Sequence, residues 1–277
     1  MFKTRKIISI GNYLWYFFQQ SSKALLFELS GHLAYAALLA FFPFLIFLVA
    51  LGNVLLPPDV ITQAINQIYM TTPKEVAQTI VPIIQEVTQM DNTKILTFSF
   101  LGLVWIASAA VDALRAGLNR AYECHETRSY IHCRLISLGY VVLLAFAMMV
   151  IFPLAVMVPV VLEIFHLHLG YVEWLVHGFI VFVFTFIWAF IYSHLPSKKL
   201  QIAQQLPGAI IAAIAWLILA GLFSTYLVHF SRYSVIYGSL SGVIITLLFF
   251  QLSAYIILLG AQINAIRLKK HPNKPVH

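Results

Sequence analysis

Five residues with polar groups recur at alternating spacings of three and four near the middle of the chain: Trp105, Ser108, Asp112, Arg115 and Asn119. On a helix, this spacing places all five residues on one face. The stripe begins inside an apolar segment and continues past the end of that segment. A polar face is costly in lipid unless it meets protein or water, so this stripe is the first candidate for a functional site.

Asp112 and Arg115 lie three residues apart and can form an ion pair where the helix leaves the apolar layer. Arg115 and Arg120 would attract an anionic head group or solute, while Asp112 would hold the arginine in place or carry a proton. We therefore predict an inner vestibule, meaning a polar cavity at the cytoplasmic end of the membrane domain. The alternative is that these arginines only anchor the cytoplasmic end of a span.

Two further polar stripes are predicted on other apolar helices. Glu28, His32 and Tyr35 follow spacings of four and three at the inner end of the first span, level with Asp112. A histidine there can titrate near neutral pH, although a histidine that only packs and hydrogen-bonds is the alternative. The second of these stripes lies on the last span and consists of Gln251, Tyr255 and Gln262, which share one face because offsets of four and eleven nearly superimpose on a helix. These uncharged residues could line a polar passage, but we favour hydrogen bonds between helices.

Composition indicates which elements must position these residues. Hydrophobic residues make up 61% of the chain and charged residues 10%, whereas a soluble domain carries about a quarter charged residues. A helix of about 20 apolar residues crosses a bilayer. We predict an all-α membrane protein with six spans: His32–Leu56, Ile95–Val111, Leu135–Leu162, Trp174–Ser193, Leu206–Phe230 and Ser239–Ala265.

Lysine and arginine are unevenly distributed among the segments that connect these spans. Fourteen of the 17 fall in the N-terminal segment, the 2–3 and 4–5 loops and the C-terminal tail. By the positive-inside rule, both termini are predicted to be cytoplasmic. The basic start lacks a clean apolar core with a small-residue cleavage site, so the first span is expected to be an uncleaved anchor.

The 277 residues are interpreted as a single membrane domain with three flanking segments. Residues 1–30 are predicted to form an amphipathic segment on the inner membrane surface, and residues 266–277 a basic cytoplasmic tail. The outer loop, residues 57–94, repeats apolar residues at helical spacing from Val76 to Val87, which predicts one or two short amphipathic helices. Small residues four apart, such as Gly208 with Ala212, predict close helix packing.

Several classes of chemistry are not indicated. Cys124, His125, His132 and Cys133 do not match the spacing of zinc fingers or ribbons, so no metal is predicted. No nucleophile elbow or phosphate-binding loop is present, and no catalytic residue or cofactor is predicted. The net charge of +7 is interpreted as membrane topology, and no nucleic-acid partner is expected.

An ordered set of short motifs resembles the YihY/BrkB family of bacterial inner-membrane proteins over about residues 25–268. The set comprises Trp105–Ser108, Leu118–Tyr122 with Arg128 and Arg134, Leu195–Pro196, Leu206–Ala209, Tyr237–Leu240 and Leu259–Ala265, together with Tyr35, Pro43, Trp216, Phe223 and Tyr226. Gln262 stands where the family pattern usually has glutamate. The resemblance implies a six-helix protein of the bacterial inner membrane, and such proteins are often interpreted as transporters. Some members of the family carried a ribonuclease label, which these residues do not support.

Our leading hypothesis is a transporter or exporter of an anionic or amphiphilic compound, such as a lipid, through the inner vestibule. The expected partners are membrane lipids, an unidentified small amphiphile or anion, and a second copy of the chain. The alternative is an envelope scaffold or assembly factor that transports nothing and acts through protein contacts. A membrane enzyme ranks third, because it would need an activity that depends on one titratable residue such as His32.

Overall fold

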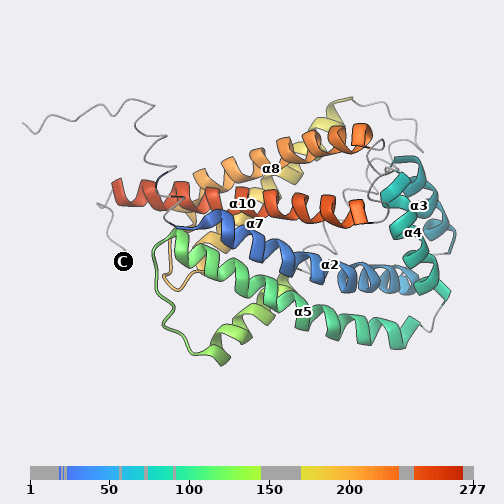
Figure 1. Ribbon diagram of the computed structural model, residues 1–277, viewed down its shortest axis with the longest axis horizontal. Coiled ribbons are helices and arrows are strands. Elements are labelled where there is room, and N and C mark those ends of the chain that lie inside the picture. The colour runs from blue at the N-terminus through green and yellow to red at the C-terminus, as the bar shows by residue number, and fades with distance from the viewer. Residues whose placement is uncertain are drawn as a thin grey trace, which may run out of the picture.

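The structure is a computed structural model that describes residues 19, 21, 24–55, 58–71, 74–89, 92–144, 170–230 and 240–270. These residues form α-helices and contain no strand (Figure 1). The helices are α2 (Leu26–Leu55), α3 (Pro58–Thr71), α4 (Lys74–Gln89), α5 (Asn92–Ala121), an unlabelled helix (Tyr130–Leu144), α7 (Gly170–His194), α8 (Ile202–Phe230) and α10 (Leu240–Lys270).

Four of these helices contain stretches that are long and apolar enough to cross a membrane: Leu26–Val54, Phe100–Ala121, Ile202–Tyr226 and Val243–Lys269. They correspond to the predicted first, second, fifth and sixth spans, so the all-α class and these four apolar helices are confirmed. There are also two shorter apolar stretches. Tyr130–Leu144 overlaps the start of the predicted third span, and Val181–His194 overlaps most of the predicted fourth span. Most of the predicted third span, residues 145–162, lies outside the described residues.

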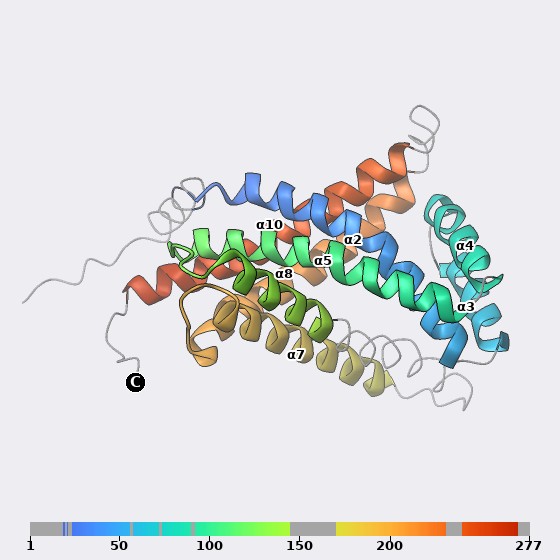
Figure 2. The ribbon, with the colours of Figure 1, turned by 90° about the horizontal axis from the view of Figure 1, so that it is seen from below.

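The long helices form a bundle in which α2 and α10 are central. α2 packs along α5 on one side and against α10 on the other, while α8 packs against both α10 and α7 (Figures 1 and 2). Leu114 and Leu118 of α5 and Leu258 of α10 belong to the shared apolar core. The end of α5 therefore meets the ends of the other helices across packed side chains, which places its polar stripe within reach of other segments.

The helix ends gather at one end of the bundle. The Tyr122 hydroxyl, just after α5, donates a hydrogen bond of 2.6 Å to Gln205 Oε1 near the start of α8. Lys269 Nζ, near the end of α10, lies 2.5 Å from Glu123 Oε1. This end also holds the start of α2 and the junction between α7 and α8, and we call it the junction end (Figure 2).

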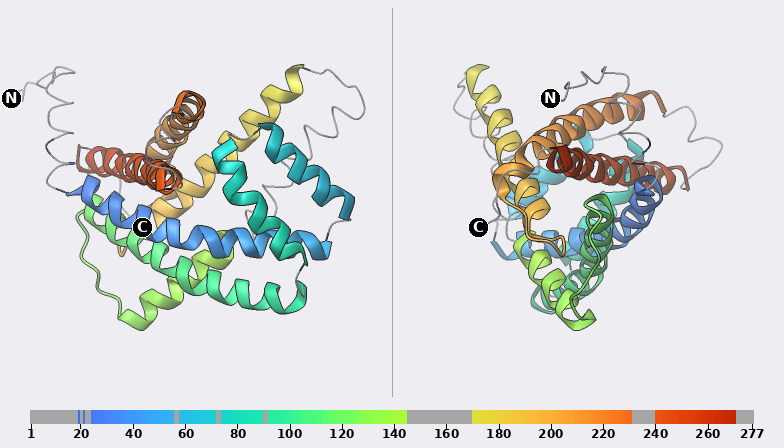
Figure 3. Two further views of the ribbon diagram at one scale, coloured as in Figure 1. Left: turned by 45° about the vertical axis from the view of Figure 1, so that its right-hand side comes forward. Right: turned by 90° about the vertical axis from the view of Figure 1, so that its left-hand side faces the viewer.

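The helices α3 and α4 lie at the opposite end of the bundle, beside the end of α2 (Figures 1 and 3). They confirm the short helices predicted in the loop at residues 57–94. α4 buries Ala77, Val81, Ile84 and Val87, which recur every three or four residues, and exposes polar residues such as Glu86. The side chains of Val76 and Ile80 lie outside the described residues.

α8 and α10 approach closely at two glycines. A Cβ atom on Gly208 would lie 2.1 Å from the carbonyl oxygen of Gly260, so no larger residue fits there. Ala209, Ala212 and Ala213 of α8 are also buried, as the predicted small-residue pattern requires. Small residues four apart at the start of the sixth span, Gly238 and Gly242, predict a similar contact, but Gly238 lies outside the described residues.

Helix ends differ from predicted segment ends because hydropathy marks the membrane edge and not the helix end. α5 continues through its charged residues to Ala121, and α10 continues to Lys270. The first five residues of the predicted tail at residues 266–277 are therefore helical. Of the predicted segment at residues 1–30, α2 takes up the last five, and residues 1–18 lie outside the described residues.

Candidate functional site

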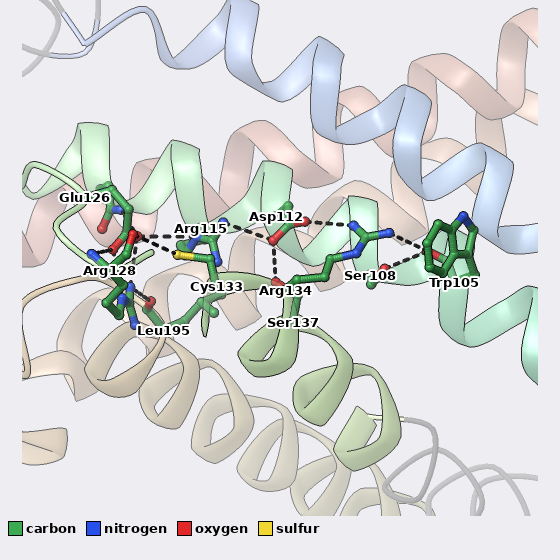
Figure 4. A network of polar contacts seen from close by, with 11 residues as sticks. Trp105, Ser108, Asp112, Arg115, Glu126, Arg128, Cys133, Arg134, Ser137 and Leu195 are labelled. Carbon is green, nitrogen blue, oxygen red and sulfur yellow. Dashed lines mark hydrogen bonds and ion pairs between the residues drawn. The ribbon is translucent and has the colours of Figure 1, made fainter. Parts of the chain in front are cut away.

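The polar stripe of α5 lies at the junction end and faces the helix Tyr130–Leu144 and the loop before it (Figure 4). Ser108 is fully buried, and its hydroxyl donates to the carbonyl oxygen of Trp105 at 2.6 Å. Asn119 is also buried, whereas the Trp105 side chain is 68% exposed. The predicted stripe therefore runs from an exposed aromatic residue at its apolar end to a buried amide at its polar end.

Asp112 is the centre of the site. Its Oδ2 accepts a hydrogen bond from Arg134 Nη1 at 2.9 Å, and its Oδ1 accepts one from the Ser137 hydroxyl at 2.5 Å. Arg115 Nη2 lies 3.0 Å from the same Oδ1. The predicted Asp112–Arg115 ion pair is present in the structure, but Asp112 is shared with a second arginine that comes from the next helix.

Glu126 is the second carboxylate of the site. It accepts bonds from Arg128 Nε at 2.8 Å, Arg128 Nη2 at 3.0 Å and Asn119 Nδ2 at 3.0 Å, and Arg115 Nε lies 3.4 Å away. The bonds from Arg128 hold the pKa of this carboxyl at about 2, well below its ordinary 4.5. Glu126 is therefore ionised at neutral pH, and Arg115 bridges it to Asp112.

A chain reversal at the end of α5 places Glu126 beside the last turns of that helix. Glu123 has a positive φ of 54°, its N–H donates to the Arg120 carbonyl, and the Cys124 N–H donates to the Asn119 carbonyl. This is the Schellman arrangement of a helix C-terminus, which reverses the chain. The loop that follows therefore runs back past Asn119, where Glu126 meets its donors.

The same loop is joined to the segment between α7 and α8. Arg128 Nη2 donates to the Leu195 carbonyl at 3.1 Å, and the Ser197 hydroxyl donates to the His125 carbonyl at 2.9 Å. The Ser197 N–H donates to Asn119 Oδ1 at 2.8 Å. Asn119 therefore uses both ends of its amide, one toward Glu126 and one toward the α7–α8 segment.

Arg134 lies across the exposed end of the stripe. Its Nη2 donates to the Trp105 carbonyl at 3.3 Å, and its guanidinium carbon lies 5.0 Å from the centre of the Trp105 ring, within cation–π range. Arg115 is more enclosed, with a side chain that is 12% exposed. Its Nη1 is buried and has no hydrogen-bond partner among the described residues.

The structure brings together four stripe residues, Ser108, Asp112, Arg115 and Asn119, with Trp105 at their exposed end. Arg120 is exposed at the end of the same helix. The α2 residues Glu28, His32 and Tyr35 are also exposed, and no described hydrogen bond or ion pair joins them to Asp112. The predicted meeting of this α2 stripe with Asp112 therefore stays a prediction.

The secondary polar face on α10 packs mainly against α2. Tyr255 makes an edge contact with the ring of Phe27, at 5.5 Å between centroids, and Gln251 lies beside Gly31. Gln262 is buried, and its Oε1 has no partner among the described residues. A hydrogen-bonded contact between helices occurs two residues further along α10, where Asn264 accepts from the Gly208 N–H and donates to the Gln205 carbonyl, both at 2.8 Å.

Sequence reasoning assigned no site role to Glu126, Arg128, Arg134 and Ser137, which complete the network. Arg134 and Ser137 lie three apart on a helix, and that spacing alone would have placed them on one face. Glu126 and Arg128 lie in a loop, where no periodicity exists, so only the structure could place them. The described residues contain no group of three or more His, Cys, Asp or Glu side chains arranged to hold a metal ion.

Comparison with known proteins shows the family to which this chain belongs. The family described as Virulence factor BrkB matches residues 17–276, which is nearly the whole chain. The chain belongs to the BrkB family. This confirms the resemblance stated from the sequence motifs, and together with the four apolar helices it makes the protein a membrane protein of this family.

Two relatives in the BrkB family match over almost their whole length. The provisionally named ribonuclease-like protein YfkH of Bacillus subtilis is 32% identical over 266 residues, which cover 90% of this chain and 93% of the relative. A UPF0761 membrane protein of Haemophilus influenzae is 25% identical over 272 residues, covering 93% of this chain and 95% of the relative. No solved structure matches the chain.

Proposed function

We propose that this BrkB-family protein is an inner-membrane transporter or exporter that moves an anionic or amphiphilic compound through a vestibule at its junction end. The proposal includes six spans with both termini in the cytoplasm, so that the junction end faces the cytoplasm. The observation that carries it is the ionic network of Arg115, Arg128 and Arg134 around Asp112 and Glu126. Ionisable groups packed at the end of an apolar helix are costly and are usually retained for function.

The geometry of the network supports a role in opening and closing. Its residues come from α5, the following loop and the helix Tyr130–Leu144, and they are held together by bonds that a competing anion can replace. A substrate anion that binds Arg115 or Arg134 would loosen the hold of Asp112 on the helix Tyr130–Leu144. The proposal relies on the α5 stripe and does not require the exposed residues of α2.

A flip assay in liposomes tests the proposal. The full chain is reconstituted with fluorescently labelled phosphatidylglycerol, and the transfer of label between leaflets is followed by chemical quenching. We expect the protein to speed this transfer and Asp112→Asn or Arg134→Gln to slow it at least tenfold, while Arg267→Gln, an exposed arginine on α10, leaves it unchanged. Transfer no faster than in empty liposomes, or folded variants at full rate, would refute the proposal.

A second candidate function is an envelope scaffold or assembly factor that acts through protein contacts. The observation that favours it is the folded pair α3 and α4, which presents polar residues such as Gln85 and Glu86 at the end of the bundle opposite the junction end. Under this alternative, substitutions at those positions disturb envelope assembly, and Asp112→Asn does not. Both candidates are non-enzymatic, and the ribonuclease-like name is that of the relative alone.

A further inference from the structure

We infer that the region where Trp105 meets Arg134 binds a lipid whose head group is a phosphodiester with a single negative charge. The head group would lie on Arg134 and Arg115, and an acyl chain would follow the exposed face of α5. The inference rests on the proposed function, because it names the substrate class of the same site. We call this region the lipid site, formed by Phe98, Leu101, Trp105, Arg115 and Arg134.

The charge of the network favours a monoanion. Three guanidinium groups, from Arg115, Arg128 and Arg134, are balanced by two carboxylates, from Asp112 and Glu126, which leaves one net positive charge. Glu126 is engaged mainly by Arg128, so the excess charge lies on the two arginines that share Asp112. A phosphodiester, with one negative charge, neutralises this excess, whereas a zwitterionic head group does not.

The arginines also have unused hydrogen-bond donors. A guanidinium carries five N–H donors in a planar fork that matches phosphate oxygens. Arg134 makes two described bonds, to Asp112 and to the Trp105 carbonyl, and its side chain is still 21% exposed. The Nη1 of Arg115 is buried without a partner among the described residues, which is a state that a polar ligand or water normally relieves.

An apolar track leads away from these donors. Phe98, Leu101 and Trp105 are 74%, 58% and 68% exposed, and their spacings of three and four place them in one row on α5. Seven residues of helix span about 10 Å, which is a substantial part of one acyl chain. On the helix that carries Arg134, Ile131 and Leu135 are also exposed apolar residues.

The row and the network meet at Trp105, where the exposed ring lies beside the Arg134 guanidinium (Figure 4). One turn further along, Ser108 is fully buried, so the exposed apolar row ends where the charged network begins. A ligand that fills both parts must carry an anionic head directly attached to an apolar chain. A free anion would use only the arginines, and a neutral lipid would use only the row.

Native mass spectrometry of the delipidated full chain in detergent tests the lipid site. The probes are phosphatidylglycerol, phosphatidylcholine and glycerophosphoglycerol, which is the phosphatidylglycerol head group without its chains. We expect one phosphatidylglycerol to bind at least tenfold more tightly than phosphatidylcholine, with glycerophosphoglycerol competing only at a hundredfold excess. Equal binding of the two lipids would overturn the inference, and competition by the head group at equal concentration would show a free-anion site instead.

The variants separate a specific site from general lipid coating. Arg134→Gln should bring phosphatidylglycerol binding down to the phosphatidylcholine level, Trp105→Ala should weaken it several-fold, and Arg267→Gln should leave it unchanged. Arg134→Lys keeps the charge but loses the fork, so it should bind at an intermediate level, and it carries the test if Arg134→Gln does not fold. Wild-type binding in folded Arg134→Lys and Trp105→Ala would overturn the inference.

The outcomes also separate this inference from the proposed transport. Specific phosphatidylglycerol binding without faster flipping in liposomes would refute transport and leave the lipid site in place. Flipping that depends on Asp112, with no preference between the two lipids, would refute the lipid site and leave transport in place.

Discussion

Gly208→Ala should strongly destabilise the bundle, because it places a methyl group where two helix backbones touch. The added Cβ would lie 2.1 Å from the Gly260 carbonyl oxygen and 2.5 Å from Asn264 Nδ2. Carbon and carbonyl oxygen normally approach to about 3.3 Å, so α8 and α10 must separate by roughly 1 Å. The contact is with backbone on one side, and no rotation of a flexible side chain can relieve it.

The magnitude follows from two effects of that separation. Forcing extra volume into a packed contact costs about 1–3 kcal/mol. Moving the helices apart also lengthens the two 2.8 Å hydrogen bonds of Asn264, to the Gly208 N–H and the Gln205 carbonyl, and such bonds contribute about 0.6–1.7 kcal/mol each in membrane proteins. We therefore expect a loss of about 2–5 kcal/mol in the free energy of unfolding.

Gly221→Ala is the matched control on the same helix. A Cβ atom at Gly221 would have nothing within 4 Å, so it meets no steric obstacle. Alanine has the higher helix propensity, by up to about 1 kcal/mol, and this variant should be unchanged or slightly more stable. Denaturant unfolding in mixed micelles measures both variants. Equal stability of Gly208→Ala and Gly221→Ala would refute the close approach of α8 and α10 described above.

Three further predictions concern the junction end. Glu126→Gln should lower the free energy of unfolding by about 1–2 kcal/mol at pH 7, after allowance for partial exposure. Because the folded pKa is depressed to about 2 from 4.5, the difference from wild type should persist above pH 4.5 and disappear as pH falls toward 2 in unfolding titrations. Asp112→Asn should lower the free energy of unfolding by about 3 kcal/mol, because it leaves two arginines without their shared carboxylate. In a double-mutant cycle, adding Arg134→Gln should restore about 1–2 kcal/mol of that free energy. In the Tyr130→Cys variant, the new thiol stands at a 79% exposed position and should react with a membrane-permeant maleimide far faster than buried Cys133. If the junction end is cytoplasmic, an impermeant maleimide should not label this thiol in intact cells.

Apolar length and small-residue spacing were enough to predict much of the fold. Long apolar runs gave α2, α5, α8 and α10, because in lipid a helix satisfies its own backbone hydrogen bonds and has few alternatives. The pair Gly208 and Ala212 predicted a close helix contact, and the structure places it against Gly260 of α10. Hydropathy could not find the helix ends, since charged residues continue α5 and α10 beyond the apolar stretch.

The candidate site was predicted only where its residues share a helix. The Asp112–Arg115 pair follows directly from a spacing of three, and the structure contains it at 3.0 Å. The partners of that pair come from a loop and from the next helix, so the position of Glu126 depends on the reversal at Glu123, a residue type that seldom adopts a positive φ. No pattern in the sequence marks that turn. The α2 stripe is exposed and has no described bond to Asp112, because helical spacing defines a shared face but not the direction in which that face points.

Asn119 links the charged site to the rest of the bundle, and this connection gives the proposed transport cycle a physical route. Its Nδ2 donates to Glu126, and its Oδ1 accepts from the Ser197 N–H in the segment between α7 and α8. An anion that draws Arg115 away from Glu126 changes the position of a carboxylate that Asn119 also holds. Since the amide is buried and both of its ends are bonded, it cannot follow Glu126 without releasing Ser197. In the proposed cycle, events at the arginines would therefore be transmitted through Asn119 to the segment before α8, the helix in which Gly208 packs directly against the backbone of α10.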